Sequence, residues 1–145
     1  MTSYSPAETA EKSGFSIDTL RYYEKIGLLS DIARNASGRR VFSDDDLAWL
    51  NMLRCLRETG MPIAEMLRYS ELTRAGEETV QERIELLQTH DRRVEEQIER
   101  LRVQQGQIQR KLGFYREVAG GCAALLPQAG AAARNGQAEV SAARP

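Results

Sequence analysis

The sequence predicts a mainly α-helical fold, in which a winged helix-turn-helix unit is followed by one long helix. Three observations predict it. Two short capped helical segments are joined by a glycine-containing turn, a turn-rich stretch between β-prone segments comes next, and an apolar repeat of 3.5 residues follows. The expected domains are residues 1–75 for the winged unit, 76–116 for a coiled-coil dimerisation helix, and 117–145 for a short C-terminal segment and disordered tail.

The first two helices are predicted from the residues at their ends. Ser5 is suited to cap the first helix, with Glu8 where a capping box needs it and Gly14 at its end. Ser16 caps a second helix over residues 17–25. The expected apolar core of this helical pair consists of Ala7, Ala10, Phe15, Leu20 and Leu28.

A β-hairpin is predicted next, around the turn sequence Asn35-Ala36-Ser37-Gly38. A hairpin placed after a helix-turn-helix is a wing, and its tip would present Arg39 and Arg40. Residues 32–43 also contain Arg34 and no acid, so this loop is locally basic on a chain with a net charge of −1.

Two further helices follow the hairpin. Ser43 is suited to cap the first of them. The helix dipole favours the three aspartates that follow it in the first turn, so we interpret them as capping residues and not as metal ligands. The apolar repeat of this helix is Leu47, Leu50, Leu53 and Leu56. The next helix is expected over residues 63–73, with an apolar side made of Ile63, Met66, Leu67 and Tyr69.

The long helix has the most regular pattern in the chain. Steps of four and three residues give Val80, Ile84, Leu87, Asp91, Val94, Ile98, Leu101, Gln105, Ile108, Leu112 and Tyr115. All but Asp91 and Gln105 are apolar, which is typical of a coiled coil. Because one helix cannot bury this seam alone, the pattern predicts a partner, most simply a second copy of the chain. His90 borders the seam and is interpreted as a solvated or interface residue.

Composition argues against several classes of protein. Two cysteines and one histidine are too few for a disulfide scaffold or a four-ligand zinc site. No apolar run approaches the roughly 20 residues that span a bilayer, so a cytoplasmic protein without membrane contact is expected. The chain has no phosphate-binding loop, no nucleophile beside a base and no paired carboxylates, so we expect no enzyme activity, cofactor or metal.

The second helix has the residue types of a DNA-recognition helix. Its N-terminal half carries Ser16, Thr19 and Arg21, and arginine can donate two hydrogen bonds to guanine or pair with a phosphate. Tyr22 and Tyr23 are consecutive, so they point about 100° apart and cannot both pack inward. An outward phenol can bind a phosphate. The alternative is that one tyrosine is a core residue and the other is merely exposed.

These residues resemble a known family. The strings "YSPAETAEKSGFSIDTLRYYEKIGLL", "RNASGRRVFSDDDL" and "LRETGMPIAEM", followed by the apolar repeat, resemble the MerR family of bacterial transcription regulators over residues 4–115. The resemblance implies an antiparallel homodimer on double-stranded promoter DNA. An effector then makes the dimer bend and untwist an overlong promoter spacer for RNA polymerase.

The resemblance also assigns residues. It implies DNA contacts from Arg21, Tyr22, Tyr23, Arg34 and Arg40, and a second wing at Met61, Pro62 and Ile63. The family's wing commonly reads Gly-Tyr-Arg-x-Tyr. Here Arg39 and Phe42 stand at the two tyrosine positions, so those phenol contacts are lost and Arg39 is expected to supply a cationic contact instead.

A cysteine in the third expected helix is the candidate sensor. Cys55, in "LRCLRETGMPI", resembles a cysteine of the family branch that responds to reactive aldehydes and other electrophiles. The resemblance therefore implies a role in a stress response. Arg54 and Arg57 are close in sequence, and cations favour the reactive thiolate. The alternative is an inert small core residue. Cys122 is either a bystander or a second redox partner. The other function considered is a coiled-coil adaptor with no inducer.

Overall fold

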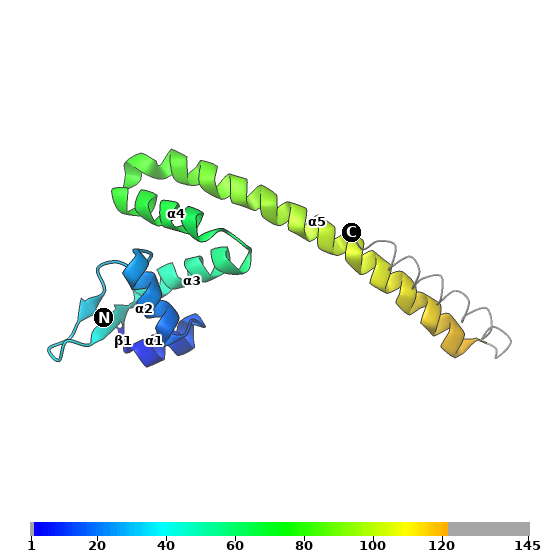
Figure 1. Ribbon diagram of the computed structural model, residues 1–145, viewed down its shortest axis with the longest axis horizontal. Helices are drawn as coiled ribbons and strands as arrows, with labels where there is room; N and C mark the ends of the chain where they lie inside the picture. Colours follow the sequence, from blue (N-terminus) through cyan, green and yellow to red (C-terminus); the bar gives the residue numbers. More distant parts are fainter. Residues whose placement is uncertain (1, 122–145) are drawn as a thin grey trace. The chain divides into compact units, whose positions relative to one another are not determined.

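The computed structural model describes residues 2–121, which form two compact units, one ending at Val94 and one beginning at Glu95. The elements (Figure 1) are β1 (Ser3–Tyr4), α1 (Pro6–Ser13), α2 (Ile17–Ile26), β2 (Ala33–Arg34), β3 (Arg40–Ser43), α3 (Asp44–Glu58), α4 (Ile63–Ala75), a 3₁₀ turn (Glu77–Thr79) and α5 (Val80–Gly120). Among the described residues, no helix is long and apolar enough to cross a membrane. Cys122 and the expected tail lie outside the described residues.

The helix-turn-helix is confirmed, with the predicted caps. Ser5 accepts a hydrogen bond from the Glu8 amide at 3.2 Å, and Glu8 accepts one from the Ser5 amide at 3.1 Å, which completes the capping box. Gly14, at φ 78°, ends α1 in the left-handed conformation that glycine adopts without steric cost. The Ser16 hydroxyl accepts from the Thr19 amide at 3.0 Å and so caps α2.

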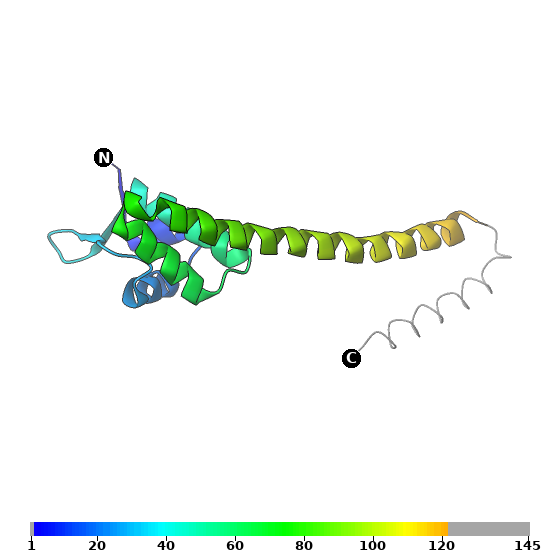
Figure 2. The same cartoon turned by 90° about the horizontal axis from the view of Figure 1, so that it is seen from above.

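The wing is confirmed as an antiparallel pair of β2 and β3, with Arg34 opposite Arg40. Its loop projects away from the neighbouring helices (Figure 2). The sheet also has a third strand, β1, which pairs with the other side of β3 so that Tyr4 lies opposite Phe42. The strand order β1-β3-β2 was not predicted, because a two-residue strand carries no alternation that could be read from sequence.

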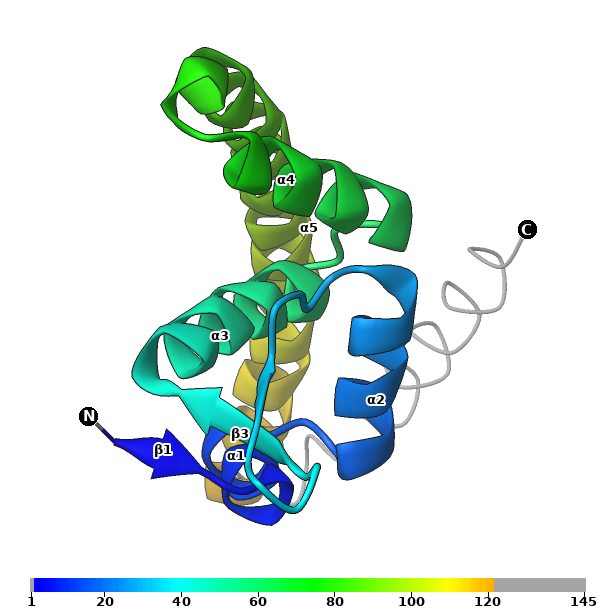
Figure 3. The same cartoon turned by 90° about the vertical axis from the view of Figure 1, so that its left-hand side faces the viewer.

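The core of the first unit lies between the sheet, α2, α3 and α4 (Figure 3). It contains three of the four α3 residues of the predicted apolar repeat, Leu50, Leu53 and Leu56, all at most 2 % exposed, whereas the fourth, Leu47, is half-buried. Two predictions of burial are wrong. Ala7 is exposed, and the fully buried residues of α1 are Thr9 and Ser13; the Thr9 hydroxyl donates to the Ser5 carbonyl at 2.8 Å. Ile63 is 43 % exposed, because the first turn of α4 presents it outward.

The C-terminal end of α2 is held by side chains of α3 and α4. Trp49 donates from Nε1 to the Leu28 carbonyl at 2.8 Å, and Arg74 donates to the Gly27 carbonyl at 2.7 Å. The Trp49 ring stacks on Tyr69 with 5.6 Å between ring centroids. These contacts satisfy carbonyl groups that the end of a helix leaves free, and they fix the direction of α2.

Helix α5 covers the whole predicted seam. Leu86 and Leu87 are partly buried against the core of the first unit, whereas Leu101 and Ile108, in the second unit, are 64 % and 67 % exposed. Of the two alternatives for His90, a solvated or an interface residue, the solvated one is wrong. The residue is 6 % exposed, and its Nε2 lies 2.7 Å from the Thr59 hydroxyl within the first unit.

Candidate nucleic-acid interface

The exposed face of α2 carries Arg21 and Tyr22. Tyr22 is 52 % exposed, and the Arg21 side chain is 63 % exposed. Arg21 lies 3.8 Å from the Asp18 carboxylate, a surface pair of negligible strength that leaves the guanidinium available. Ser16 and Thr19 lie one turn earlier, where their hydroxyls bind each other at 2.9 Å. Thr19 is half-buried.

Tyr23 belongs to the core and not to the exposed face. It is 4 % exposed, and its ring packs edge-to-face on Phe15 with 5.2 Å between centroids. The resemblance implied a DNA contact from Tyr23, but its ring is buried in the core and is not part of the exposed face. Of the two readings of the tyrosine pair, the structure has one tyrosine inside and one exposed, because a 100° step carries the second ring into the helical core.

The wing turn is braced by its own polar groups. The Asn35 side chain accepts hydrogen bonds from the Ser37 and Arg39 amides, each at 3.0 Å. Arg34 donates to the Gly38 carbonyl at 2.9 Å, and Gly38 adopts φ 79°. The side chains of Arg34 and Arg39 are exposed, so the wing carries accessible positive charge on a short, ordered loop.

Arg40 lies differently from the prediction. It was expected as a free cation at the wing tip. Instead its Nε lies 2.5 Å from the Glu24 carboxylate of α2, with side chains only 29 % and 26 % exposed. The pairing was not predicted, since Glu24 and Arg40 are sixteen residues apart and meet only when the wing folds back on α2.

A cavity of about 320 Å³ opens beside the exposed face of α2. It is lined by Thr19, Tyr22 and Tyr23 of α2, Arg57 of α3, and Met61, Ile63 and Met66 around the start of α4. Sequence reasoning considered Arg57 only as a neighbour of Cys55. Its guanidinium lies 5.7 Å from the Phe15 ring centroid, a cation–π contact that holds the positive charge near Tyr22. Its place one turn before the expected second wing was the signal that could have found it.

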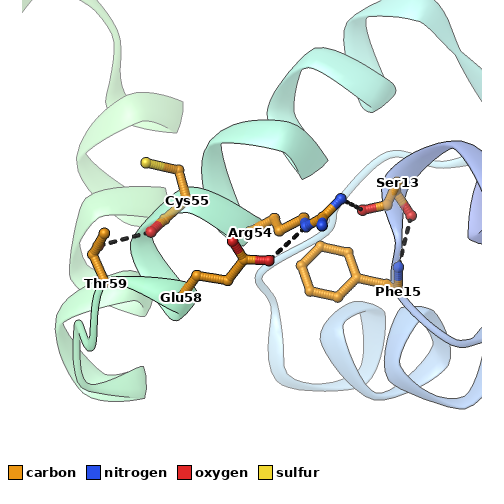
Figure 4. Close-up of polar contacts among 6 residues, drawn as sticks. All are labelled: Ser13, Phe15, Arg54, Cys55, Glu58 and Thr59. Atoms are coloured by element: carbon orange, nitrogen blue, oxygen red, sulfur yellow. Dashed lines mark hydrogen bonds and ion pairs between the residues drawn. The ribbon is translucent and has the colours of Figure 1, made fainter. Parts of the chain in front are cut away.

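Cys55 is exposed, but neither nearby arginine is directed to it. Arg54 donates to Glu58 at 2.7 Å and to the Ser13 carbonyl at 3.4 Å, and Figure 4 shows its guanidinium directed away from the Cys55 sulfur. Arg57 lies over Phe15. The expected cationic activation of the thiol therefore has no contact to support it. The alternative of a core cysteine is wrong as well, because the side chain is exposed.

The start of α4 is tied to α5 by an ion pair. Arg93 donates two hydrogen bonds to the Glu65 carboxylate, at 2.7 and 2.6 Å. These bonds hold the pKa of the Glu65 carboxyl below its ordinary value of 4.5, against a smaller opposing effect of burial. The described residues contain no cluster of three or more His, Cys, Asp or Glu side chains that could hold a metal ion.

Comparison with known proteins identifies the family. The model of the MerR HTH family of regulatory proteins matches residues 4–71, and the MerR DNA-binding model matches residues 47–111. An HTH-type transcriptional regulator of Haemophilus influenzae, itself uncharacterised, is 40 % identical over 114 residues, which are 79 % of this chain and 84 % of that protein. The regulator AdhR of Bacillus subtilis is 35 % identical over 56 % of this chain and 58 % of its own length.

Solved structures agree with this. HiNmlR, described as a MerR family regulator that lacks the sensor domain and is bound to promoter DNA, matches with a TM-score of 0.74 and 39 % identity over 82 % of this chain and 94 % of its own. A MerR family regulator from Bacillus thuringiensis matches with a TM-score of 0.70 and 29 % identity over 77 % of this chain and 98 % of its own. The family and these relatives are transcriptional regulators and not enzymes. This chain belongs to the MerR family of DNA-binding transcriptional regulators.

Proposed function

We propose that the chain binds promoter DNA as a homodimer and regulates transcription by distorting that DNA. One observation carries the proposal. The exposed Arg21 and Tyr22 of a helix-turn-helix lie beside a wing that carries the exposed Arg34 and Arg39, in a chain 39 % identical to a regulator bound to promoter DNA. Residues 1–75 form the DNA-binding part in this proposal, and residues 76–116 form the dimerisation helix.

The proposed contacts follow the geometry of α2 and the wing. Arg21 reads a guanine edge in the major groove, and the Tyr22 hydroxyl binds a phosphate. Ser16 and Thr19 stand at the end of α2 that enters the groove first. Arg34 and Arg39 contact the phosphates under the wing, and the second wing at Met61, Pro62 and Ile63 contacts the backbone. Arg40 contributes through Glu24, by orienting the wing, and Tyr23 contributes as a core ring.

The homodimer is supported by the exposed seam of α5. In the second unit, an apolar groove is lined by Ile98, Leu101 and Ile108 together with the alkyl parts of neighbouring polar residues. Such a stripe on an otherwise polar helix is stabilised only when it is covered, and antiparallel pairing with a second copy covers it along its length. The dimer then places two helix-turn-helix units on one duplex. Bending and untwisting of the spacer realigns the promoter for RNA polymerase.

A response to electrophiles through Cys55 is a second, narrower proposal. It is supported by the exposure of the thiol, which lies four residues before the turn that leads into the second wing. A small aldehyde can reach such a thiol without opening the core.

The experiment that tests the main proposal combines footprinting and sedimentation. The protein is footprinted on DNA from its own upstream region, and its affinity is measured between 50 and 200 mM salt, where phosphate-dominated binding falls by orders of magnitude, about 10³-fold or more. A dimer that protects a pseudo-palindrome with this salt dependence supports the proposal. A monomer, or a dimer with no salt-dependent operator binding, contradicts it and favours the coiled-coil adaptor.

A further inference from the structure

Thr59 is the residue where α3 ends and the turn toward the second wing begins. Its hydroxyl donates to the Cys55 carbonyl at 2.7 Å, one helical turn back. Gly60 follows with φ 89°, and the Met61 amide then donates to the Leu56 carbonyl at 2.9 Å. The turn is thus built from local hydrogen bonds, which fix its shape but not its position relative to α5.

His90 supplies the contact that reaches this turn from α5. Its Nε2 lies 2.7 Å from the Thr59 oxygen. The Thr59 hydroxyl has two carbonyl acceptors, Cys55 at 2.7 Å and Leu56 at 3.2 Å, so a ring proton on Nε2 lets the imidazole donate to the Thr59 oxygen. The other ring nitrogen, Nδ1, is buried and has no hydrogen-bond partner among the described residues. The tautomer with its proton on Nε2 therefore fits this site better, because a proton on Nδ1 would be buried without an acceptor.

A second tie lies one turn along the same face of α5. Arg93, three residues after His90, holds Glu65 in the first turn of α4. The two contacts hold the segment Met61-Pro62-Ile63 from both sides, because Thr59 precedes it and Glu65 follows it. Arg93 and Glu65 remain about one-third exposed, whereas His90 is buried.

We infer that His90 is a positioning residue that holds the second wing at a fixed place on α5 through the Thr59 hydroxyl. The inference rests on the proposed function, in which the segment Met61-Pro62-Ile63 touches the DNA backbone. A wing that is fixed to the dimerisation helix moves with it, so the strain of bending DNA is carried into α5. A second wing without this contact would be more mobile, and it would lose more conformational entropy on binding the same phosphates.

The first test compares two threonines. Thr59→Val removes the hydroxyl that meets His90, while Thr73→Val is the matched control, because the Thr73 hydroxyl also donates to a carbonyl one turn back, that of Tyr69 at 2.9 Å. Amide hydrogen exchange is measured in the full chain. We expect exchange of the Gly60 and Met61 amides to accelerate about fivefold or more in Thr59→Val and to stay unchanged in Thr73→Val, with the α1 and α2 amides unaffected.

The second test varies the ring. His90→Leu fills the site without a donor, and His90→Gln can return an amide N–H to the Nε2 position. We expect His90→Leu to loosen the turn as Thr59→Val does, His90→Gln to restore it, and the double variant Thr59→Val/His90→Leu to exchange within about twofold of either single variant, since both remove one contact. Operator affinity at fixed salt should fall about five- to tenfold in Thr59→Val and His90→Leu.

The outcomes separate the inference from the proposed function. Equal exchange in Thr59→Val and Thr73→Val overturns the inference, as does a double variant in which the two effects multiply. A loosened turn with unchanged operator affinity also overturns it, because the contact would then be structural only. If the unsubstituted chain binds no operator, the proposed function fails, while the exchange comparison, which needs no DNA, still decides whether His90 holds the turn.

Discussion

The Arg40 guanidinium and the Glu24 carboxylate lie 2.5 Å apart, and this ion pair joins the wing strand β3 to helix α2. Both side chains are about three-quarters covered, so the pair is screened less by solvent and salt than an exposed one would be. The wing and α2 are therefore held together, and the charge of Arg40 is already compensated within the protein.

Glu24→Gln should make DNA binding more dependent on salt. The amide still accepts a hydrogen bond from Arg40, but it leaves the guanidinium charge uncompensated, and an additional phosphate contact steepens the log–log salt slope by about one. Affinity at low salt should rise accordingly. The measurement is binding to non-specific and operator duplexes across a salt series.

The control for this change is Glu11→Gln, which removes the same charge from an exposed position on α1. It should raise affinity slightly through net charge without changing the slope. Equal slopes in the two variants would show that Arg40 is not released toward DNA.

Arg21→Ala should lower operator affinity by about 1–3 kcal/mol and relax the base preference at one position of each half-site. The reason is that the exposed Arg21 has no strong partner in the protein, and in the proposed function it contacts a base in the major groove. Lys25→Ala removes a positive charge from the other end of α2 and should weaken binding evenly across sequences. Competition assays with single-base operator variants distinguish the two, and an unchanged ranking of operators in Arg21→Ala would contradict the assignment.

The helices could be predicted from the sequence because their ends are defined locally. Ser5 with Glu8, Gly14, Ser16 and Ser43 each act within four residues of their own position, and the caps in the structure are the ones expected. The seam of α5 was predicted for the same reason, since its period repeats along one helix.

The features that sequence could not give are those set by tertiary contacts. Tyr23 and Tyr22 are indistinguishable as letters, and only packing on Phe15 makes one of them a core ring. Arg40 finds Glu24, and His90 finds Thr59, across loops that have no local code. The direction of Arg54 toward Glu58 and Ser13, away from Cys55, is likewise a matter of rotamer and not of spacing.

The Glu65–Arg93 pair should make part of the stability depend on pH. The folded-state pKa of Glu65 lies below its ordinary value of 4.5, so the pair stabilises the fold fully above that value and its contribution is lost as pH falls through the folded pKa. The difference in unfolding free energy between the unsubstituted chain and Glu65→Gln should be constant above about pH 5.5 and shrink below 4.5. Denaturant titrations at several pH values measure it.

Glu71→Gln is the control for that series. Glu71 lies on the same helix, but its ion pair is a weak one, 3.8 Å from the exposed Arg68. Its effect on unfolding should be small at every pH. A Glu65→Gln difference that does not change with pH would show that the carboxylate charge contributes nothing to the contact.

Cys55→Ser should leave operator affinity unchanged and abolish induction by aldehydes, if the thiol is the reacting group. The serine hydroxyl is close in size and the site is exposed, so no packing is lost. In vitro transcription with and without a small aldehyde is the measurement, and thiol modification followed by mass spectrometry identifies the residue. Full induction of Cys55→Ser would remove Cys55 from the mechanism.

Leu101→Glu should separate the homodimer, and Val103→Glu should not. The two residues are 64 % and 60 % exposed and stand two positions apart on α5, but Leu101 belongs to the apolar seam and Val103 points about 200° away from it. Covering a carboxylate with an apolar partner helix costs several kcal/mol, so the dimer should weaken about a hundredfold or more.

Sedimentation at micromolar concentration should then find Leu101→Glu monomeric and Val103→Glu dimeric. Operator binding should be lost with the dimer, because a monomer has one helix-turn-helix unit and can contact only one half-site. Equal behaviour of the two variants would mean that the seam is not the surface through which two chains meet.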